Sequence, residues 1–136
     1  MKYYFLDTNI LIDFLANREP HGKFALLIFD KARKGEWKLW TSDNSITTTY
    51  YIIEKAVGTA KAKEKIGRLL RFVEIQPVGK AELLFAITAD FQDYEDAVQY
   101  HCALTIEQVN GIVTRNQKDF KNSQIPVHGP EEVLII

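Results

Sequence analysis

The sequence predicts an α/β fold, a three-layer sandwich in which helices cover both faces of a central, mainly parallel sheet. Short apolar runs with strand character alternate along the chain with longer segments whose apolar residues recur every three or four positions. Turn-forming residues separate the two kinds of segment. The chain has 136 residues and shows no internal repeat or linker, so we expect one domain covering residues 1–136.

The first predicted elements are well marked. Residues 2–7, KYYFLD, are aromatic and aliphatic and predict a buried strand. Residues 9–18 carry apolar side chains at positions 10, 11, 14 and 15, which is helical spacing, and Pro20 punctuates the end of this helix. A second helix is expected from Lys23, because the same spacing returns and basic residues occupy its last turn. WKLWTS, residues 37–42, predicts the next strand.

Residues 43–57 are less clear, because their Thr, Tyr and Ile residues favour a strand. Ser45 can cap a helix, however, and apolar residues follow it at helical spacing, so we expect a helix. The remaining elements continue the alternation. They are a lysine-rich helix at 59–72, a strand at 72–78, helices at about 80–91 and 94–105, a strand at 111–115 and, after a polar turn, a short strand and a final helix within 125–136.

Charge and cysteine content exclude several classes of protein. Seventeen basic and eighteen acidic side chains give a net charge of -1, so no bulk field attracts nucleic acid or a membrane, and a polyanion must bind a local patch. Cys102 is the only cysteine, which excludes an intramolecular disulfide and a multi-cysteine metal site. Polar residues interrupt the N-terminal apolar run, so we expect neither a signal peptide nor a membrane span. A cytoplasmic protein fits these features.

Polar side chains gather where two predicted strands end, in FLDTN and IVTRNQKDF. The carboxyl ends of parallel strands share one edge of a sheet, so we expect the same edge to carry Asp7, Asn9, Thr114, Asn116 and Asp119. The helix before the second strand opens with DYED, residues 93–96, and its first turn can reach the same edge. Mg²⁺ and Mn²⁺ prefer carboxylate oxygens and leave coordination positions for substrate phosphates. The pattern therefore predicts a divalent cation site.

The acids also have a purely structural interpretation. Asp93 and Asp96 are spaced as in a capping box, with Asp93 as the N-cap and Asp96 complementing the helix dipole. Asp7 can be a helix cap, and Asp119 a turn former. Both interpretations can hold together. Three independent caps, however, would have no reason to fall on one edge of the sheet.

FLDTNILI, DYEDAVQYHCAL, GIVTRNQKDF and IPVHGPEEVL, in this order, resemble a PIN domain over essentially the whole chain. The resemblance implies a metal-dependent endoribonuclease, of the kind that serves as the toxin of a toxin-antitoxin pair. It implies an RNA substrate and an antitoxin protein as partners. Exposed aromatic side chains would suit a homodimer, and no membrane partner is expected. The residues that it places in the site are the acids Asp7, Asp96 and Asp119, the additional acid Asp93, and the polar pair Thr114 and Asn116.

The chain departs from the family pattern at one position. A glutamate is usual early in the third helix, where this chain carries Tyr50 or Tyr51, and Glu54 lies about one turn later. Three alternatives follow: Glu54 substitutes as a metal ligand, Asp93 supplies the missing charge, or a second metal site is weak. The tyrosine also supports a different function, a PIN-like binding module for RNA or protein that has no turnover.

If the protein is an enzyme, we expect a water bound to one or two Mg²⁺ or Mn²⁺ ions to hydrolyse an RNA phosphodiester. Arg115 and Lys118 lie inside the acidic motif and, with Thr114, are candidates for binding substrate. A phosphotransferase with Asp7 as its nucleophile is disfavoured, because Asn9 stands where such enzymes commonly have a second acid. No glycine-rich nucleotide-binding motif is present.

Overall fold

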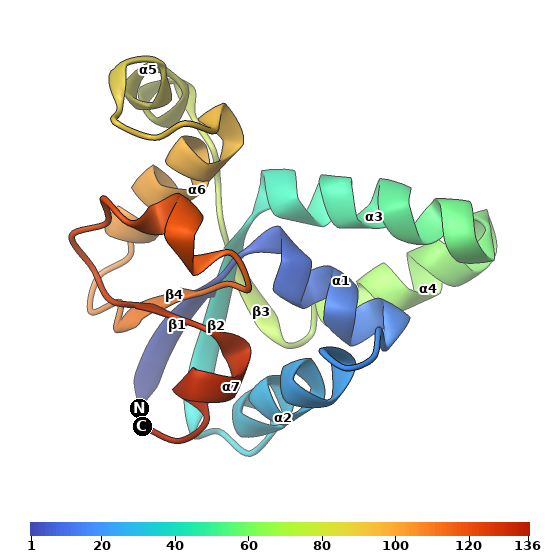
Figure 1. The fold of residues 1–136 in the computed structure, drawn as a ribbon. Helices are drawn as coiled ribbons and strands as arrows, with labels where there is room; N and C mark the ends of the chain where they lie inside the picture. The colour runs from blue at the N-terminus through green and yellow to red at the C-terminus, as the bar shows by residue number, and fades with distance from the viewer.

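The computed structural model describes residues 1–136 and contains one five-stranded sheet of order β3-β2-β1-β4-β5 (Figure 1). All four strand pairings are parallel. The predicted parallel α/β architecture is therefore confirmed. The strands are β1 (Lys2–Leu6), β2 (Trp37–Ser42), β3 (Val73–Gln76), β4 (Gly111–Val113) and β5 (Val127–His128).

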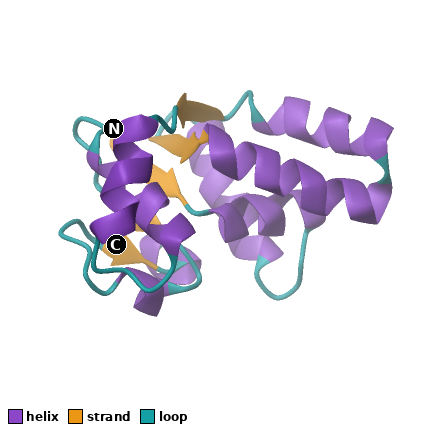
Figure 2. Ribbon diagram, turned by 90° about the horizontal axis from the view of Figure 1, so that it is seen from above, coloured by secondary structure: helices purple, strands orange, loops and turns teal.

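Helices connect the strands, because parallel neighbours require crossover connections. They are α1 (Thr8–Ala16), α2 (Gly22–Arg33), α3 (Asp43–Val57), α4 (Thr59–Leu69), α5 (Lys80–Thr88), α6 (Tyr94–Leu104) and α7 (Pro130–Val133), with a short 3₁₀ helix, η1 (Gln117–Phe120). Helices α3 and α4 form a pair that extends away from the sheet in both views (Figures 1 and 2). None of the helices has the length and hydropathy needed to cross a membrane.

Alternating side chains of β1 divide the core between the two faces of the sheet. Tyr4 and Leu6 pack in the larger apolar cluster, which includes residues of α1, α2, α3, α4 and α7. Phe5 packs in a second cluster, with Tyr100 of α6 and Phe120 of η1. The sheet is thus covered on both faces, and its carboxyl edge lies between α1 and α3 on one side and α6 on the other.

The structure corrects the predictions mainly at element ends. Helix α3 is capped by Ser42, whose side chain accepts from the Ser45 backbone N–H at 3.0 Å, so Ser45 is not the cap. Helix α4 ends at Leu69 and not at residue 72, because the chain turns there into β3. The expected polar turn after β4 contains η1, which sequence analysis did not predict.

Candidate functional site

Asp7 follows β1 at the centre of the carboxyl edge and is only 5% exposed. Its backbone N–H donates to the Val113 carbonyl at 3.0 Å, which extends the pairing of β1 with β4. One carboxylate oxygen accepts from the Thr8 backbone N–H at 2.8 Å and caps α1, while the other accepts from the Thr114 hydroxyl at 2.7 Å. Asp7 is therefore both a helix cap and a fixed carboxylate at the sheet edge. Burial raises its pKa, and the negative charges of Asp119 and Asp93 act in the same direction.

Asp93 caps α6, because its Oδ1 accepts from the Asp96 backbone N–H at 2.9 Å. The start of α6 lies close enough to Asp7 for the charge of Asp93 to act on Asp7 and for the charge of Asp7 to act on Asp96. Burial raises the pKa of Asp96 to about 7, and the charges of Asp7, Asp93, Asp119 and Glu95 add to the effect. The capping interpretation and the acidic cluster therefore hold together. Asp7, Asp93, Asp96 and Asp119, which come from three separate segments, influence one another electrostatically.

No cationic side chain forms an ion pair with an acid of this cluster. The chain forms eight ion pairs, and none of them includes Asp7, Asp93, Asp96 or Asp119. The acids do not form a ready cage, because no three of the protein's carboxylate, imidazole or thiol groups converge on one point. Carboxylates that repel one another and lack cationic partners fit a hard divalent cation, which prefers oxygen ligands and would lower the repulsion.

The loop after β4 supplies the remaining polar groups. Thr114 is fully buried, and its hydroxyl accepts from the Asn116 backbone N–H at 3.0 Å as well as donating to Asp7. The Thr114 hydroxyl is thus bonded to Asp7 and to the Asn116 N–H, a position that suits a residue that orients the carboxylate. Asn116 and Asp119 are exposed beyond it, and the Asp119 backbone N–H donates to the Asn116 carbonyl at 2.9 Å.

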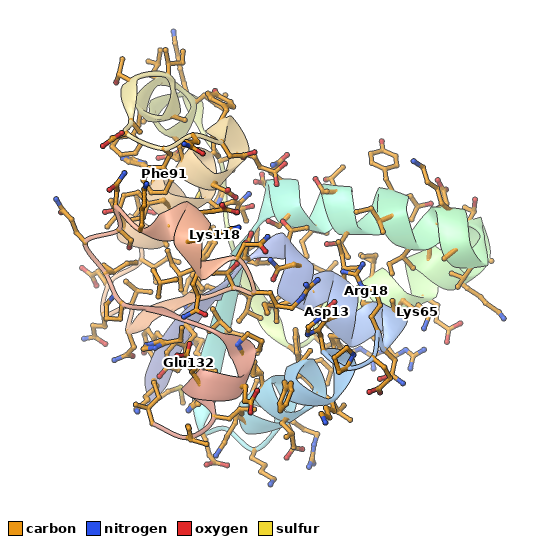
Figure 3. All side chains as sticks on the ribbon, in the orientation of Figure 1. Asp13, Arg18, Lys65, Phe91, Lys118 and Glu132 are labelled. Carbon is orange, nitrogen blue, oxygen red and sulfur yellow. The ribbon has the colours of Figure 1, made fainter.

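Lys118 lies at a cleft of about 610 Å³ beside the acids. Asp93 and Asp119 line the same cleft, together with Phe91 and Lys121. Figure 3 shows Lys118 and Phe91 on the side of the molecule where η1 approaches α6. Cations at the rim of an acidic cleft suit a phosphate group that flanks the cluster.

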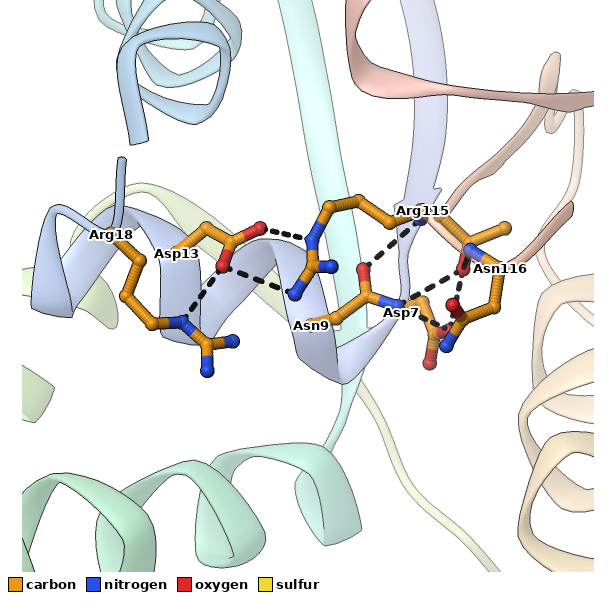
Figure 4. A network of polar contacts seen from close by, with 7 residues as sticks. Asp7, Asn9, Asp13, Arg18, Arg115 and Asn116 are labelled. Carbon is orange, nitrogen blue, oxygen red and sulfur yellow. Dashed lines mark hydrogen bonds and ion pairs between the residues drawn. The ribbon is translucent and has the colours of Figure 1, made fainter. Parts of the chain in front are cut away.

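The guanidinium group of Arg115 is directed elsewhere. Its Nε donates to Asp13 Oδ2 at 2.5 Å and its Nη2 to Asp13 Oδ1 at 3.3 Å (Figure 4). In this structure the Arg115 guanidinium group therefore forms an ion pair with a buried residue of α1.

Glu54 does not join the cluster. Its carboxylate accepts from the Tyr50 hydroxyl at 2.7 Å and from the Thr59 hydroxyl at 3.1 Å, near the junction of α3 and α4. The first turn of α3 touches the site, because the hydroxyls of Ser45 and Thr8 are 2.8 Å apart. Glu54 lies nine residues later, about 13 Å farther along the helix axis. Of the three alternatives for the missing glutamate, substitution by Glu54 finds no support in this geometry.

Some residues beside the cluster were not predicted from the sequence. Glu95 was not assigned, yet burial raises its pKa, and the charges of Asp7 and Asp93 add to the effect. Its position inside DYED was the available signal. The buried hydroxyls of Ser42 and Ser45, 3.2 Å apart, link the start of α3 to Thr8 and were also missed. Cys102 is buried, which raises its thiol pKa to about 12, so it is not a nucleophile at neutral pH.

The fold and the site define an α/β protein with a parallel sheet, whose carboxyl edge carries carboxylates without ion-pair partners. Comparison with known proteins identifies the family: the PIN domain model matches residues 3–118. Ribonuclease VapC1 of Aquifex aeolicus (strain VF5) is 31% identical over 133 residues, which cover 94% of this chain and 90% of that protein. The chain belongs to the PIN domain family, as its motifs predicted.

Two solved structures share the fold. The structure of VapBC2 from Rickettsia felis, bound to a DNA fragment from its promoter, contains a chain that matches with a TM-score of 0.68 and 17% identity, covering 93% of this chain and 98% of that one. Mycobacterium tuberculosis VapC20, described as a Sarcin-Ricin loop cleaving toxin, matches with a TM-score of 0.62 and 14% identity, covering 80% and 86%.

Proposed function

We propose that this protein is an endoribonuclease that uses Mg²⁺ or Mn²⁺ to hydrolyse RNA phosphodiester bonds. The observation that carries the proposal is the group of carboxylates at the sheet edge, none of which forms an ion pair. Within this group, burial and then the neighbouring acids raise the pKa of Asp96 to about 7. Membership of the PIN domain family and the similarity to Ribonuclease VapC1 support the same activity.

Asp7, Asp96 and Asp119 would hold the cation, with Asp93 as an additional ligand. When bound, the cation supplies an activated water and stabilises charge on the phosphate oxygens. The protein's own groups prepare this site. The Thr114 hydroxyl holds one Asp7 oxygen in place, and Asn9 Nδ2 donates to Thr114 Oγ1 at 3.2 Å. Asn116, exposed beside Thr114, would orient a carboxylate or the attacking water.

Lys118 would bind an RNA phosphate next to the scissile bond. It shares a cleft with Asp93 and Asp119, so a phosphate there would lie beside the cation. Lys121 lines the same cleft and is a second candidate for this contact, one that sequence analysis did not single out. The basic groups that meet RNA would thus be local, consistent with a net charge of -1.

We also infer that the protein is the toxin component of a cytoplasmic toxin-antitoxin pair, with an antitoxin and a second copy of the chain as partners. The similarity to Ribonuclease VapC1 and to the VapBC2 chain supports this role. Exposed apolar side chains on α5 offer a surface for the second copy, since Leu84 is 56% and Ile87 69% exposed.

The deciding experiment compares the wild type with Asp96→Asn, with and without Mn²⁺. We expect Mn²⁺ to raise the melting temperature of the wild type and to support cleavage of an RNA substrate, and the variant to lose both effects while it remains folded. Binding of Mn²⁺ without cleavage would contradict the ribonuclease. No response to Mn²⁺ would favour a PIN-like module that binds RNA or protein without turnover, as the absence of Glu54 from the cluster allows.

A further inference from the structure

Asp13 is a buried carboxylate on α1 that takes no direct part in the acidic cluster. Its side chain is 1% exposed and lies between two guanidinium groups. Arg115 binds it through Nε and Nη2, and Arg18 through Nε at 3.0 Å (Figure 4). A carboxylate at this depth requires compensating charge, and the forked geometry of arginine fixes the direction from which that charge approaches.

The same face of α1 also binds the backbone of the Arg115 segment. Asn9 precedes Asp13 by four residues, so the two side chains project from one face of the helix. Asn9 Oδ1 accepts from the Arg115 backbone N–H at 3.3 Å, and Asn9 Nδ2 donates to the Thr114 hydroxyl. Helix α1 therefore holds Arg115 at two points, its backbone N–H and its guanidinium group.

This attachment fixes the segment 114–116, which serves the acidic cluster. Thr114 donates to Asp7 and accepts from the Asn116 backbone N–H, and η1 with Asp119 follows directly. Arg18 contacts the same Asp13 carboxylate but lies in the segment after α1, away from the loop of residues 114–116. The two arginines thus both bind Asp13, but only Arg115 belongs to the segment 114–116.

We propose that Asp13 and Arg115 are positioning residues, which hold the segment 114–116 against α1 and thereby set the Thr114 hydroxyl and Asn116 relative to Asp7. Arg115 acts through Asp13 and does not contact RNA. Arg18 only contributes charge to Asp13. The consequence for cleavage rests on the proposed function, but the consequences for the loop and for Mn²⁺ binding do not require turnover.

Three variants of the full chain separate these roles. Arg115→Gln and Arg18→Gln each remove one of the two guanidinium groups from Asp13 and leave the other, so they are matched in charge and partner. Asp13→Asn removes the shared carboxylate. The measurements are the melting temperature, amide hydrogen exchange of Asn116, the Mn²⁺ dissociation constant from electron paramagnetic resonance, and kcat and KM for an RNA substrate.

We expect all three variants to melt below the wild type. Arg115→Gln and Asp13→Asn should accelerate exchange of the Asn116 amide and weaken Mn²⁺ binding by about tenfold or more, the usual effect of losing a group that orients metal ligands. They should lower kcat more than they raise KM, and the double variant should be no worse than either single one. Arg18→Gln should leave Asn116 exchange and the Mn²⁺ dissociation constant at their wild-type values.

Two outcomes would overturn the proposal. If Arg18→Gln loosens Asn116 and weakens Mn²⁺ as much as Arg115→Gln does, Asp13 has only a general stabilising role. If Arg115→Gln raises KM while Asp13→Asn leaves KM unchanged, Arg115 contacts RNA directly. Should Arg115→Gln fail to fold, Arg115→Lys retains the charge without the fork and should show the same loosening. A wild type that binds Mn²⁺ but cuts no RNA refutes the ribonuclease alone, because hydrogen exchange and Mn²⁺ binding still test the positioning role.

Discussion

At the scale of one residue, Asp96 shows that an ionised carboxylate in the site lowers the free energy of unfolding. Its pKa rises from 3.8 to about 7 in the folded protein, through burial first and the neighbouring acids second. Between these pH values the folded state keeps a proton that the unfolded state has released, so the free energy of unfolding decreases as pH rises. The cost is complete above about pH 7, where a functional carboxylate must be ionised to bind a cation.

We therefore expect metal-free Asp96→Asn to melt above the wild type at about pH 8, and expect this difference to shrink toward zero near pH 4. Thermal melts of both proteins across this range, with chelator present, measure the effect. Mn²⁺ at pH 8 should remove the advantage by stabilising the wild type alone. A difference that is constant with pH would show that Asp96 does not titrate as the structure implies.

For Glu54, unlike Asp96, we expect that substitution does not affect the metal site. Its carboxylate accepts hydrogen bonds from Tyr50 and Thr59 at the distal end of α3, and it is not among the charges that shift the pKa of Asp7 or Asp96. Glu54→Gln should thus leave Mn²⁺ affinity and RNA cleavage at wild-type levels, and should change stability by no more than about 0.5 kcal/mol, as for most surface substitutions. Mn²⁺ titration of this variant decides the matter, and a clear loss of affinity would restore Glu54 as a ligand.

At the scale of the element, Asp93 has both a structural and a functional role at the start of α6. The side chain caps the helix through the Asp96 N–H and also adds negative charge beside Asp7. Asp93→Ser retains a capping oxygen and removes the charge, whereas Asp93→Ala removes both. We expect the Ser variant to match or exceed the metal-free stability of the wild type, and the Ala variant to be less stable than the Ser variant by about 1 kcal/mol.

Both Asp93 variants should bind Mn²⁺ more weakly than the wild type, and by similar factors. Denaturant unfolding and Mn²⁺ titration together separate the two roles. If the Ser variant binds Mn²⁺ as the wild type does, Asp93 is a helix cap alone, and the charge of the absent family glutamate is not replaced at this position.

The same scale explains what sequence could reveal. Every strand and every α-helix was expected from apolar patterns together with caps and turn residues, and β2 and α3 were placed with their full bounds. Helix η1 was missed because it is a single short turn within a polar stretch that is typical of a loop, whereas the equally short α7 begins at a proline, which is a helix-start signal. Asp7, Asp93, Asp96 and Asp119 could be grouped because parallel strands direct their carboxyl ends to one edge. The partner of Arg115 could not be predicted, since Asp13 lies 102 residues away along the chain.

At the scale of the whole molecule, the outer surface of α5 lies apart from the acidic site, and its exposed apolar side chains suit contact with another protein. Leu84 and Ile87 are three residues apart on one face of the helix and are mostly exposed. Figure 1 shows α5 at the periphery, with α6 between it and the sheet, so its outer face has no neighbour within the chain. Apolar groups exposed in this way are costly in water and favour burial against another protein surface.

If that surface is a second copy of the chain, Leu84→Glu with Ile87→Glu should convert a dimer into a monomer, because each interface would then bury four uncompensated carboxylates. Light scattering of the purified protein measures the mass directly. Leu26→Glu with Leu27→Glu is the matched control, since these residues of α2 are also exposed, at 58% and 51%, and the same charges are added on another surface. We expect that control to remain dimeric. Loss of the dimer in the α2 variant alone would move the interface to α2, and a monomeric wild type would refute the homodimer altogether.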